Sequence, residues 1–319
     1  MLSGRLGQVV DGEDSGGALG DGAHLVRSVA MSLDVFSLPV VEQLTAHISR
    51  RQVGDESPVI VVDHPRVRAA AALQGAHLFA WQPAGEQPVL WLSEATAFKR
   101  GAAIRGGVPV CWPWFGPAGE PAHGFARISD FELAAYDEDE QGARLDFTLR
   151  SDERTRKLWP HEFVLHLRFR LGHTCEIALE AHGDYESTAA LHSYFNIGAV
   201  DGVQVSGLGI PYIDKVEETN GDQDGPLTFP GRIDRVYTDP DDVSRIEDPA
   251  LNRAIEIRHR HHSDVVSWNP GPELSKSMAD LTDDGYREFV CVETARISEP
   301  MTSTPDQPAT LSATITIAR

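Results

Sequence analysis

The segment "FVLHLRFRL", residues 163–171, carries the pattern that decides the fold. Every second side chain in it is apolar, namely Phe163, Leu165, Leu167, Phe169 and Leu171. Successive side chains of a β-strand point to opposite faces, so this alternation gives the strand one apolar and one polar face. Strands with one wet face are typical of antiparallel sheets. The segment therefore predicts an antiparallel sheet that covers a core on one side.

The same period of two recurs along the chain. It is found in "ARLDFTLR" (143–150), "CEIALEAH" (175–182) and "TLSATITIAR" (310–319), and clusters of Gly, Pro and Asp separate such stretches. Helical spacing is scarce, and residues 274–281 are one short candidate for a helix. We predict an all-β protein, a large antiparallel β-sandwich with few short helices.

Composition limits the classes of function. The chain has 319 residues, 41% of them apolar, and its net charge of −20 argues against nucleic acid or an anionic membrane as a partner. No stretch approaches the roughly 18 apolar residues of a membrane span. Cys111, Cys175 and Cys291 form no CxxC pair, which suits a reducing compartment, so we expect a cytoplasmic protein.

The first thirty residues differ from the rest of the chain. They are rich in glycine and acidic residues and show no periodicity. Such a composition does not support packing. We therefore expect a flexible tail at residues 1–30 and one β-sandwich domain at residues 31–319.

The segment "IRGGVPVCWPWFGP", residues 104–117, combines a single arginine with several aromatic residues. Its prolines remove backbone donors, so it is not a central strand. An arginine in so apolar a setting needs a buried or bound anion, which makes Arg105 a candidate binding residue. Trp112, Trp114 and Phe115 fit either core packing or the wall of a sugar pocket, and we expect at least one of them to be core.

Four further segments place ionisable groups in apolar or glycine-rich surroundings. "PAHGFAR" contains His123 and Arg127, "LHSYFNIG" contains His192, "GRIDRVY" contains Asp234, and "FVCVETA" contains Glu293. Glu293 follows an almost continuous apolar run, where a carboxylate is costly to bury without a partner. The alternative is a strand end in water. Each residue taken alone is more often structural, but their co-occurrence points to one functional site.

Six segments together resemble the aldose 1-epimerase superfamily. In order they are "IRGGVPVCWPWFG", "HGFAR", "LHSYFNIG", "DRVY", "VVSWNP" and "FVCVE". More narrowly they are similar to its glucose-6-phosphate 1-epimerase (hexose-6-phosphate mutarotase) branch, from about residue 35 to the C-terminus. The resemblance implies a large antiparallel β-sandwich with the active site on its concave face. It also implies a monomeric isomerase without a cofactor or metal.

The resemblance assigns the catalytic roles as well. The histidine of the "LH-YF" motif is His192, the general acid, and the glutamate of the "CVE" motif is Glu293, the general base. Opening a hemiacetal requires one group that takes the proton of the C1 hydroxyl and another that protonates the ring oxygen. A histidine and a carboxylate divide these roles near neutral pH.

The remaining motif residues imply the substrate. Asp234 and His123 match ligands of the sugar hydroxyls, and Arg105 and Arg127 match basic residues that favour a phosphorylated sugar. We expect a hexose 6-phosphate, glucose 6-phosphate foremost, as the small-molecule partner. In a chain of net charge −20, arginines at the mouth of a pocket would attract such an anion.

Two alternatives stay open at this stage. An epimerase of neutral sugars would differ only in the anion site, and a non-catalytic phosphosugar-binding module would need neither an acid nor a base. A metal site is not expected. The cluster "RHRHH" at residues 258–262 is interpreted as a solvated strand end, because zinc sites need three or four placed ligands.

Overall fold

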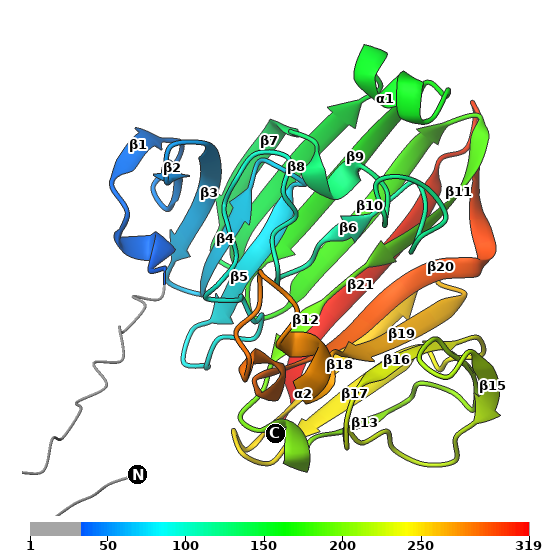
Figure 1. Ribbon diagram of the computed structural model, residues 1–319. Helices are drawn as coiled ribbons and strands as arrows, with labels where there is room; N and C mark the ends of the chain where they lie inside the picture. The colour runs from blue at the N-terminus through cyan, green and yellow to red at the C-terminus, as the bar shows by residue number, and fades with distance from the viewer. Residues whose placement is uncertain (1–32, 319) are drawn as a thin grey trace, which may run out of the picture. The chain divides into compact units, whose positions relative to one another are not determined.

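Three antiparallel sheets make up the described part of the chain, residues 33–318 of a computed structural model (Figure 1). The first sheet consists, in order, of β1 (Val40–Gln43), β2 (Ile48–Val53), β3 (Ser57–His64), β4 (Val67–Ala72) and β5 (His77–Pro83). The second consists of β13 (Gln204–Ser206), β17 (Val243–Asp248), β18 (Arg253–Arg260), β21 (Ala309–Ala318), β10 (Cys175–Gly183), β9 (Phe163–Leu171), β8 (Gly142–Arg150) and β7 (Glu132–Asp139).

The third sheet carries two of the candidate site residues described below, Asp234 and Glu293. Its order is β15 (Thr219–Asp222), β14 (Pro211–Asp214), β16 (Ile233–Tyr237), β19 (Asp264–Asn269), β20 (Phe289–Ser303), β11 (Tyr185–Leu191) and β6 (Val110–Cys111), and β12 (Tyr194–Asn196) pairs with β20. The short α-helices α1 (Glu153–Leu158) and α2 (Gly271–Ser275) lie far apart, near opposite ends of the sheets (Figure 1). Single 3-10 turns occur at Val35–Ser37, Ala126–Ile128, Val200–Gly202 and Gly285–Arg287.

The alternating segments form four neighbouring strands of the second sheet. These are β21, β10, β9 and β8, and their apolar positions face one core. Leu167 of β9, for example, lies opposite Phe147 of β8 and Leu179 of β10, and all three side chains are buried. The all-β prediction is confirmed, and α2 covers only the first part of the predicted helical stretch.

The two faces of the third sheet have different environments. On β20, Val290 and Val292 belong to the main core, whereas Cys291 and Glu293 point to the opposite face. The neighbouring strand β19 follows the same rule, since Val265 joins the core. One face of this sheet is thus free to line a cavity.

The histidine cluster differs from its sequence interpretation. His259 of β18 is only 1% exposed, so the predicted solvated strand end is wrong for this residue. Its ring lies between two hydroxyl groups, with Nδ1 2.7 Å from Oγ1 of Thr294 and Nε2 2.9 Å from Oγ of Ser244. These contacts satisfy both ring nitrogens inside the sandwich, which is why the residue tolerates burial.

Three further expectations concern the N-terminal tail, membrane-spanning segments and the cysteines. The tail predicted for residues 1–30 lies outside the described residues. Over the part of the chain that is described, no helix is long and apolar enough to cross a membrane. Cys111, Cys175 and Cys291 are free thiols, and all three are buried.

Candidate active site

All six predicted site residues line one cavity of about 680 Å³. The sequence separates them widely, but the third sheet and the loops at its edge bring them together. They are Arg105, His123, Arg127, His192, Asp234 and Glu293.

Strand register explains why the polar residues of the third sheet meet. Asp234 of β16 lies opposite Trp268 of β19, and Val266 of β19 lies opposite Glu293 of β20. Residues two apart on a strand share a face. Asp234, Trp268, Val266 and Glu293 therefore all point to the cavity, whose lining includes each of them.

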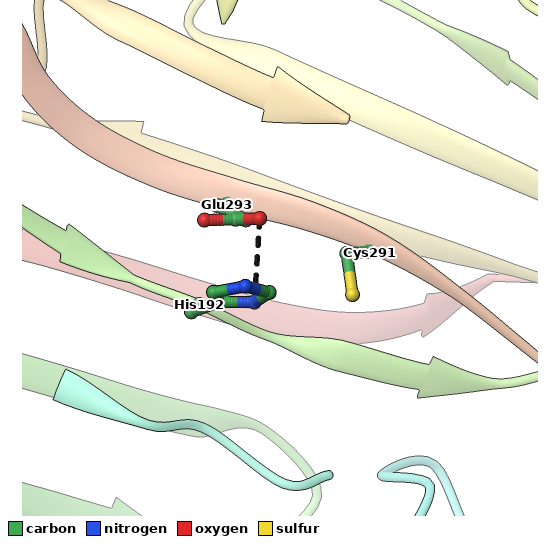
Figure 2. Close-up of side chains that lie close together, drawn as sticks. All are labelled: His192, Cys291 and Glu293. Carbon is green, nitrogen blue, oxygen red and sulfur yellow. Dashed lines mark ion pairs between the residues drawn. The ribbon is translucent and has the colours of Figure 1, made fainter. Parts of the chain in front are cut away.

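His192 and Glu293, which both line this cavity, form a close pair (Figure 2). Nδ1 of His192 lies 3.2 Å from Oε1 of Glu293, and the side chains are only 9% and 1% exposed. Glu293 comes from β20, and His192 comes from the short connection between β11 and β12. The prediction that these two residues meet is borne out in position, and Glu293 is not a strand end in water.

Burial governs the ionisation of the pair. Removal from water disfavours charge, so it lowers the pKa of His192 well below its usual range and raises the pKa of Glu293 well above its own. His123 also disfavours a charged His192, and Asp234 also disfavours a charged Glu293, whereas Arg127 favours the carboxylate of Glu293 and so opposes the rise of its pKa. Burial thus favours the uncharged forms of both groups, a neutral imidazole and a protonated carboxyl, and the pair still holds the one proton that an acid and a base exchange.

The ring of His192 is held by an aromatic neighbour. The ring of Tyr194 stacks on it at 4.8 Å between centroids with an interplanar angle of 6°. Trp268 meets the same ring edge-on at 6.1 Å. This packing fixes the orientation of the imidazole that a proton donor needs.

Arg105 supports this arrangement from the side. Its Nη1 donates a hydrogen bond to the hydroxyl of Tyr194 at 2.9 Å. Its Nε and Nη2 lie 3.1 and 3.0 Å from Oδ2 of Asp280. The anion that its apolar setting requires is thus supplied by the protein itself, through Asp280.

His123 presents a neutral imidazole to the cavity. The backbone N–H of Gly116 donates to its Nδ1 at 3.4 Å, which leaves the other ring nitrogen to carry the proton. Burial, with the charges of Arg127 and Arg105, lowers the pKa of His123 to about 4. Its Nε2–H is therefore a hydrogen-bond donor at neutral pH.

The aromatic residues of segment 104–117 serve both the core and the cavity, as the sequence indicates. Phe115 lines the cavity, whereas Trp112 is fully buried and packs edge-on against Phe125 and Phe163. Trp112 also donates its Nε1–H to Oγ of Ser187 at 3.1 Å, which satisfies its polar atom inside the core. The expectation that at least one of these rings is core is confirmed.

Among the charged and aromatic residues of the cavity lining, sequence reasoning missed two. Lys215 directly follows β14, and Trp268 lies within β19. Lys215 stands among charged residues in "DKVEE", where the sequence alone does not separate it from an ordinary surface lysine. Trp268 belongs to the "VVSWNP" segment, whose alternation could have placed it on one face with its neighbours.

Comparison with known proteins identifies the family. The sequence profile described as aldose 1-epimerase matches residues 58–316. The chain belongs to the aldose 1-epimerase family. Proteins of Salmonella typhimurium and Escherichia coli, provisionally named glucose-6-phosphate 1-epimerases, are each 56% identical to it over 290 residues, which span 89% of this chain and 98% of theirs.

A solved structure shares the fold of this aldose 1-epimerase. The crystal structure of YeaD from Salmonella typhimurium, provisionally described as a mutarotase, superposes with a TM-score of 0.88 at 56% identity. The match covers 89% of this chain and 98% of that one. The family and the fold predicted from the sequence are both confirmed. The protein is an isomerase that interconverts the anomers of a hexose.

Proposed function

We propose that this aldose 1-epimerase interconverts the α and β anomers of a hexose 6-phosphate, with glucose 6-phosphate as the expected substrate. Glu293 takes the proton of the C1 hydroxyl, and His192 gives a proton to the ring oxygen. Both oxygens are bonded to C1, so an acid and a base 3.2 Å apart reach them together. The open aldehyde rotates about the C1–C2 bond, and the reverse transfers close the ring.

The other polar residues of the cavity hold the sugar while C1 changes. Asp234 is a hydroxyl acceptor on β16, and burial raises the pKa of its carboxyl group. His123 donates from Nε2, as its contact with Gly116 requires. The indole of Trp268 offers an apolar surface for the C–H face of the ring. These groups supply the anchoring that confines movement to C1.

The phosphate preference rests on one observation, two unneutralised cations in the cavity. Arg127 and Lys215 both line it, and in the described residues neither has a carboxylate within 4.0 Å. Within residues 33–318, Arg127 donates a hydrogen bond only to the backbone carbonyl of Ala122, at 2.9 Å. Arg105, in contrast, is paired with Asp280. In a chain of net charge −20, two free cations in one cavity indicate an anionic ligand.

Kinetics with a sugar and its phosphate test this proposal. We expect Arg127→Ala and Lys215→Ala to reduce kcat/KM for glucose 6-phosphate about ten- to a hundredfold, because each removes a charge-assisted contact of roughly 1.5–3 kcal/mol. The loss should appear mainly in KM, since the phosphate is held equally in the ground and transition states. Anomer exchange is measured by NMR for glucose 6-phosphate and for glucose.

A surface variant provides the control for charge. Lys157→Ala removes one positive charge from the exposed end of α1, away from the cavity. It should leave the ratio of kcat/KM for glucose 6-phosphate to kcat/KM for glucose unchanged. Equal losses on glucose and glucose 6-phosphate in both cavity variants would contradict the phosphate assignment. That result would mean that the two cations serve the fold or bind the sugar ring instead of a phosphate.

A further inference from the structure

A buried thiol lies next to the acid–base pair (Figure 2). Ligand atoms of Cys291, His192 and Glu293 lie within 4.8 Å of one another, and all three residues are buried. Cys291 and Glu293 are two residues apart on β20, so they share a face, and His192 approaches from the connection between β11 and β12. The ring-opening chemistry uses the imidazole and the carboxylate but has no role for the thiol.

One polar atom of this cluster has no partner, and another has only an ion-pair contact. Among the described residues, Oε2 of Glu293 is buried without a hydrogen bond, and Nδ1 of His192 has its 3.2 Å contact with Oε1 of Glu293 outside hydrogen-bond geometry. Unpartnered buried polar atoms are rare and costly in folded proteins. Their positions indicate a ligand that the protein atoms leave room for. The sugar accounts for both atoms during turnover, and a metal ion is a second ligand with matching chemistry.

The donor set selects the kind of ion. One thiolate, one imidazole nitrogen and one carboxylate oxygen are ligands that Zn²⁺ and similar soft divalent ions prefer, in a tetrahedron with one open position. We propose that His192, Cys291 and Glu293 form a binding site for a thiophilic divalent cation, and that the bound ion blocks mutarotation. The ion would occupy the acid and the base together, so it would exclude the sugar.

The distances are close to those that such an ion needs. With metal–ligand bonds of about 2.0–2.3 Å, tetrahedral ligands lie roughly 3.4–3.6 Å apart. The contact of 3.2 Å between His192 and Glu293 is near this value already. The longest separation in the cluster is at most 4.8 Å, so closure on an ion requires a shift of roughly 1 Å at Cys291. The thiol loses its proton to solvent on coordination.

The donor atoms, and not the surrounding charges, make the site selective. Arg127 and Lys215 line the same cavity and oppose any bound cation, so an ion must gain enough from its ligands to offset this repulsion. A hard ion such as Mg²⁺ or Ca²⁺ gains nothing from a thiolate and requires more oxygen ligands than this cluster offers. A soft ion gains the sulfur bond. We therefore expect Zn²⁺, Cd²⁺ and Co²⁺ to bind and Mg²⁺ and Ca²⁺ to have no effect.

Titration of the full chain with Co²⁺ tests the site without relying on activity. Coordination by Cys291 should give a thiolate-to-cobalt charge-transfer band and the visible bands of a tetrahedral ion, and Zn²⁺ should displace both. Cys291→Ala should lose the charge-transfer band. Cys175→Ala, which removes another buried thiol in β10, is the matched control and should keep it. Cobalt binding without that band in the wild-type protein would overturn the proposal.

Inhibition provides the second measurement. Zn²⁺ should stop anomer exchange of glucose 6-phosphate or glucose, and a chelator should restore it. The concentration of Zn²⁺ for half-inhibition should rise at least about tenfold in Cys291→Ala but stay near the wild-type value in Cys175→Ala. Cys291→Ser, checked by circular dichroism, replaces the alanine variant if that one does not fold. Equal inhibition with and without the thiol would also overturn the proposal. Because glucose serves as well, the outcome does not depend on the phosphate preference.

Discussion

At the scale of single residues, the site is a pair of buried ionisable groups supported by neutral and charged neighbours. His192 is stacked on Tyr194, and Tyr194 is held by Arg105. Asp280 in turn fixes the guanidinium. This chain of contacts links a charge at the cavity wall to the orientation of His192, the proposed proton donor.

Arg105→Ala tests whether this chain of contacts serves catalysis. Loss of the hydrogen bond frees the hydroxyl of Tyr194 and loosens the stack on His192, so kcat should fall about tenfold for glucose and glucose 6-phosphate alike. Tyr194→Phe keeps the ring and removes the hydroxyl, and it should show part of the same loss. Both are measured by steady-state anomer exchange.

A loss of activity on glucose 6-phosphate but not on glucose in Arg105→Ala would contradict this expectation. It would make Arg105 a phosphate ligand, as the family resemblance implies. Arg105 would then join Arg127, and its contact with Asp280 would have to break when substrate binds.

At the scale of elements, the segment that carries Arg105 is fixed against β5. Gly106 and Gly107 have φ values of 116° and 60°, which side-chain-bearing residues rarely adopt. A Cβ on Gly107 would lie 2.4 Å from the carbonyl oxygen of Leu78 and 2.6 Å from Cα of Phe79. Both atoms belong to the backbone of β5, so they are not free to move aside.

Gly107→Ala should therefore be strongly destabilising. We expect a loss of about 3 kcal/mol or more in the free energy of unfolding, measured by urea titration, because backbone strain and steric clash add. Gly54→Ala is the matched control, since Gly54 has a φ of 55° but nothing within 4 Å of its Cβ position. Strain alone should cost about 1–2 kcal/mol there. Equal losses in the two variants would show that the close approach to β5 is unimportant.

At the scale of the whole molecule, local pattern predicts the strands but not how they are arranged. The alternation at residues 163–171 predicts a strand with one buried face, and β9 has that face. The pairing of β9 with β10 is a local hairpin, but nothing in the local sequence indicates that β21 pairs with the other edge of β10, because those two strands are far apart in the chain.

Local sequence also predicts part of the site but not its contacts. His192 and Glu293 are ionisable residues in apolar segments, and the motifs around them identify them as candidates. The ion pair between Arg105 and Asp280 joins residues 175 positions apart, so no local sequence pattern predicts it. Lys215 was not predicted for the same reason, because its place in the cavity lining depends on the fold. His259 was misread because its partner Thr294 lies on another sheet.

The central claim is that Glu293 and His192 open and close the sugar ring as base and acid. Anomer exchange of glucose 6-phosphate, followed by NMR with Glu293→Gln, tests it most directly. Glutamine keeps the shape of the side chain and removes the base, so exchange above the spontaneous rate should fall by about 10²–10⁴-fold while circular dichroism and the melting temperature stay near wild type. Near-normal exchange by a folded Glu293→Gln protein would contradict the account.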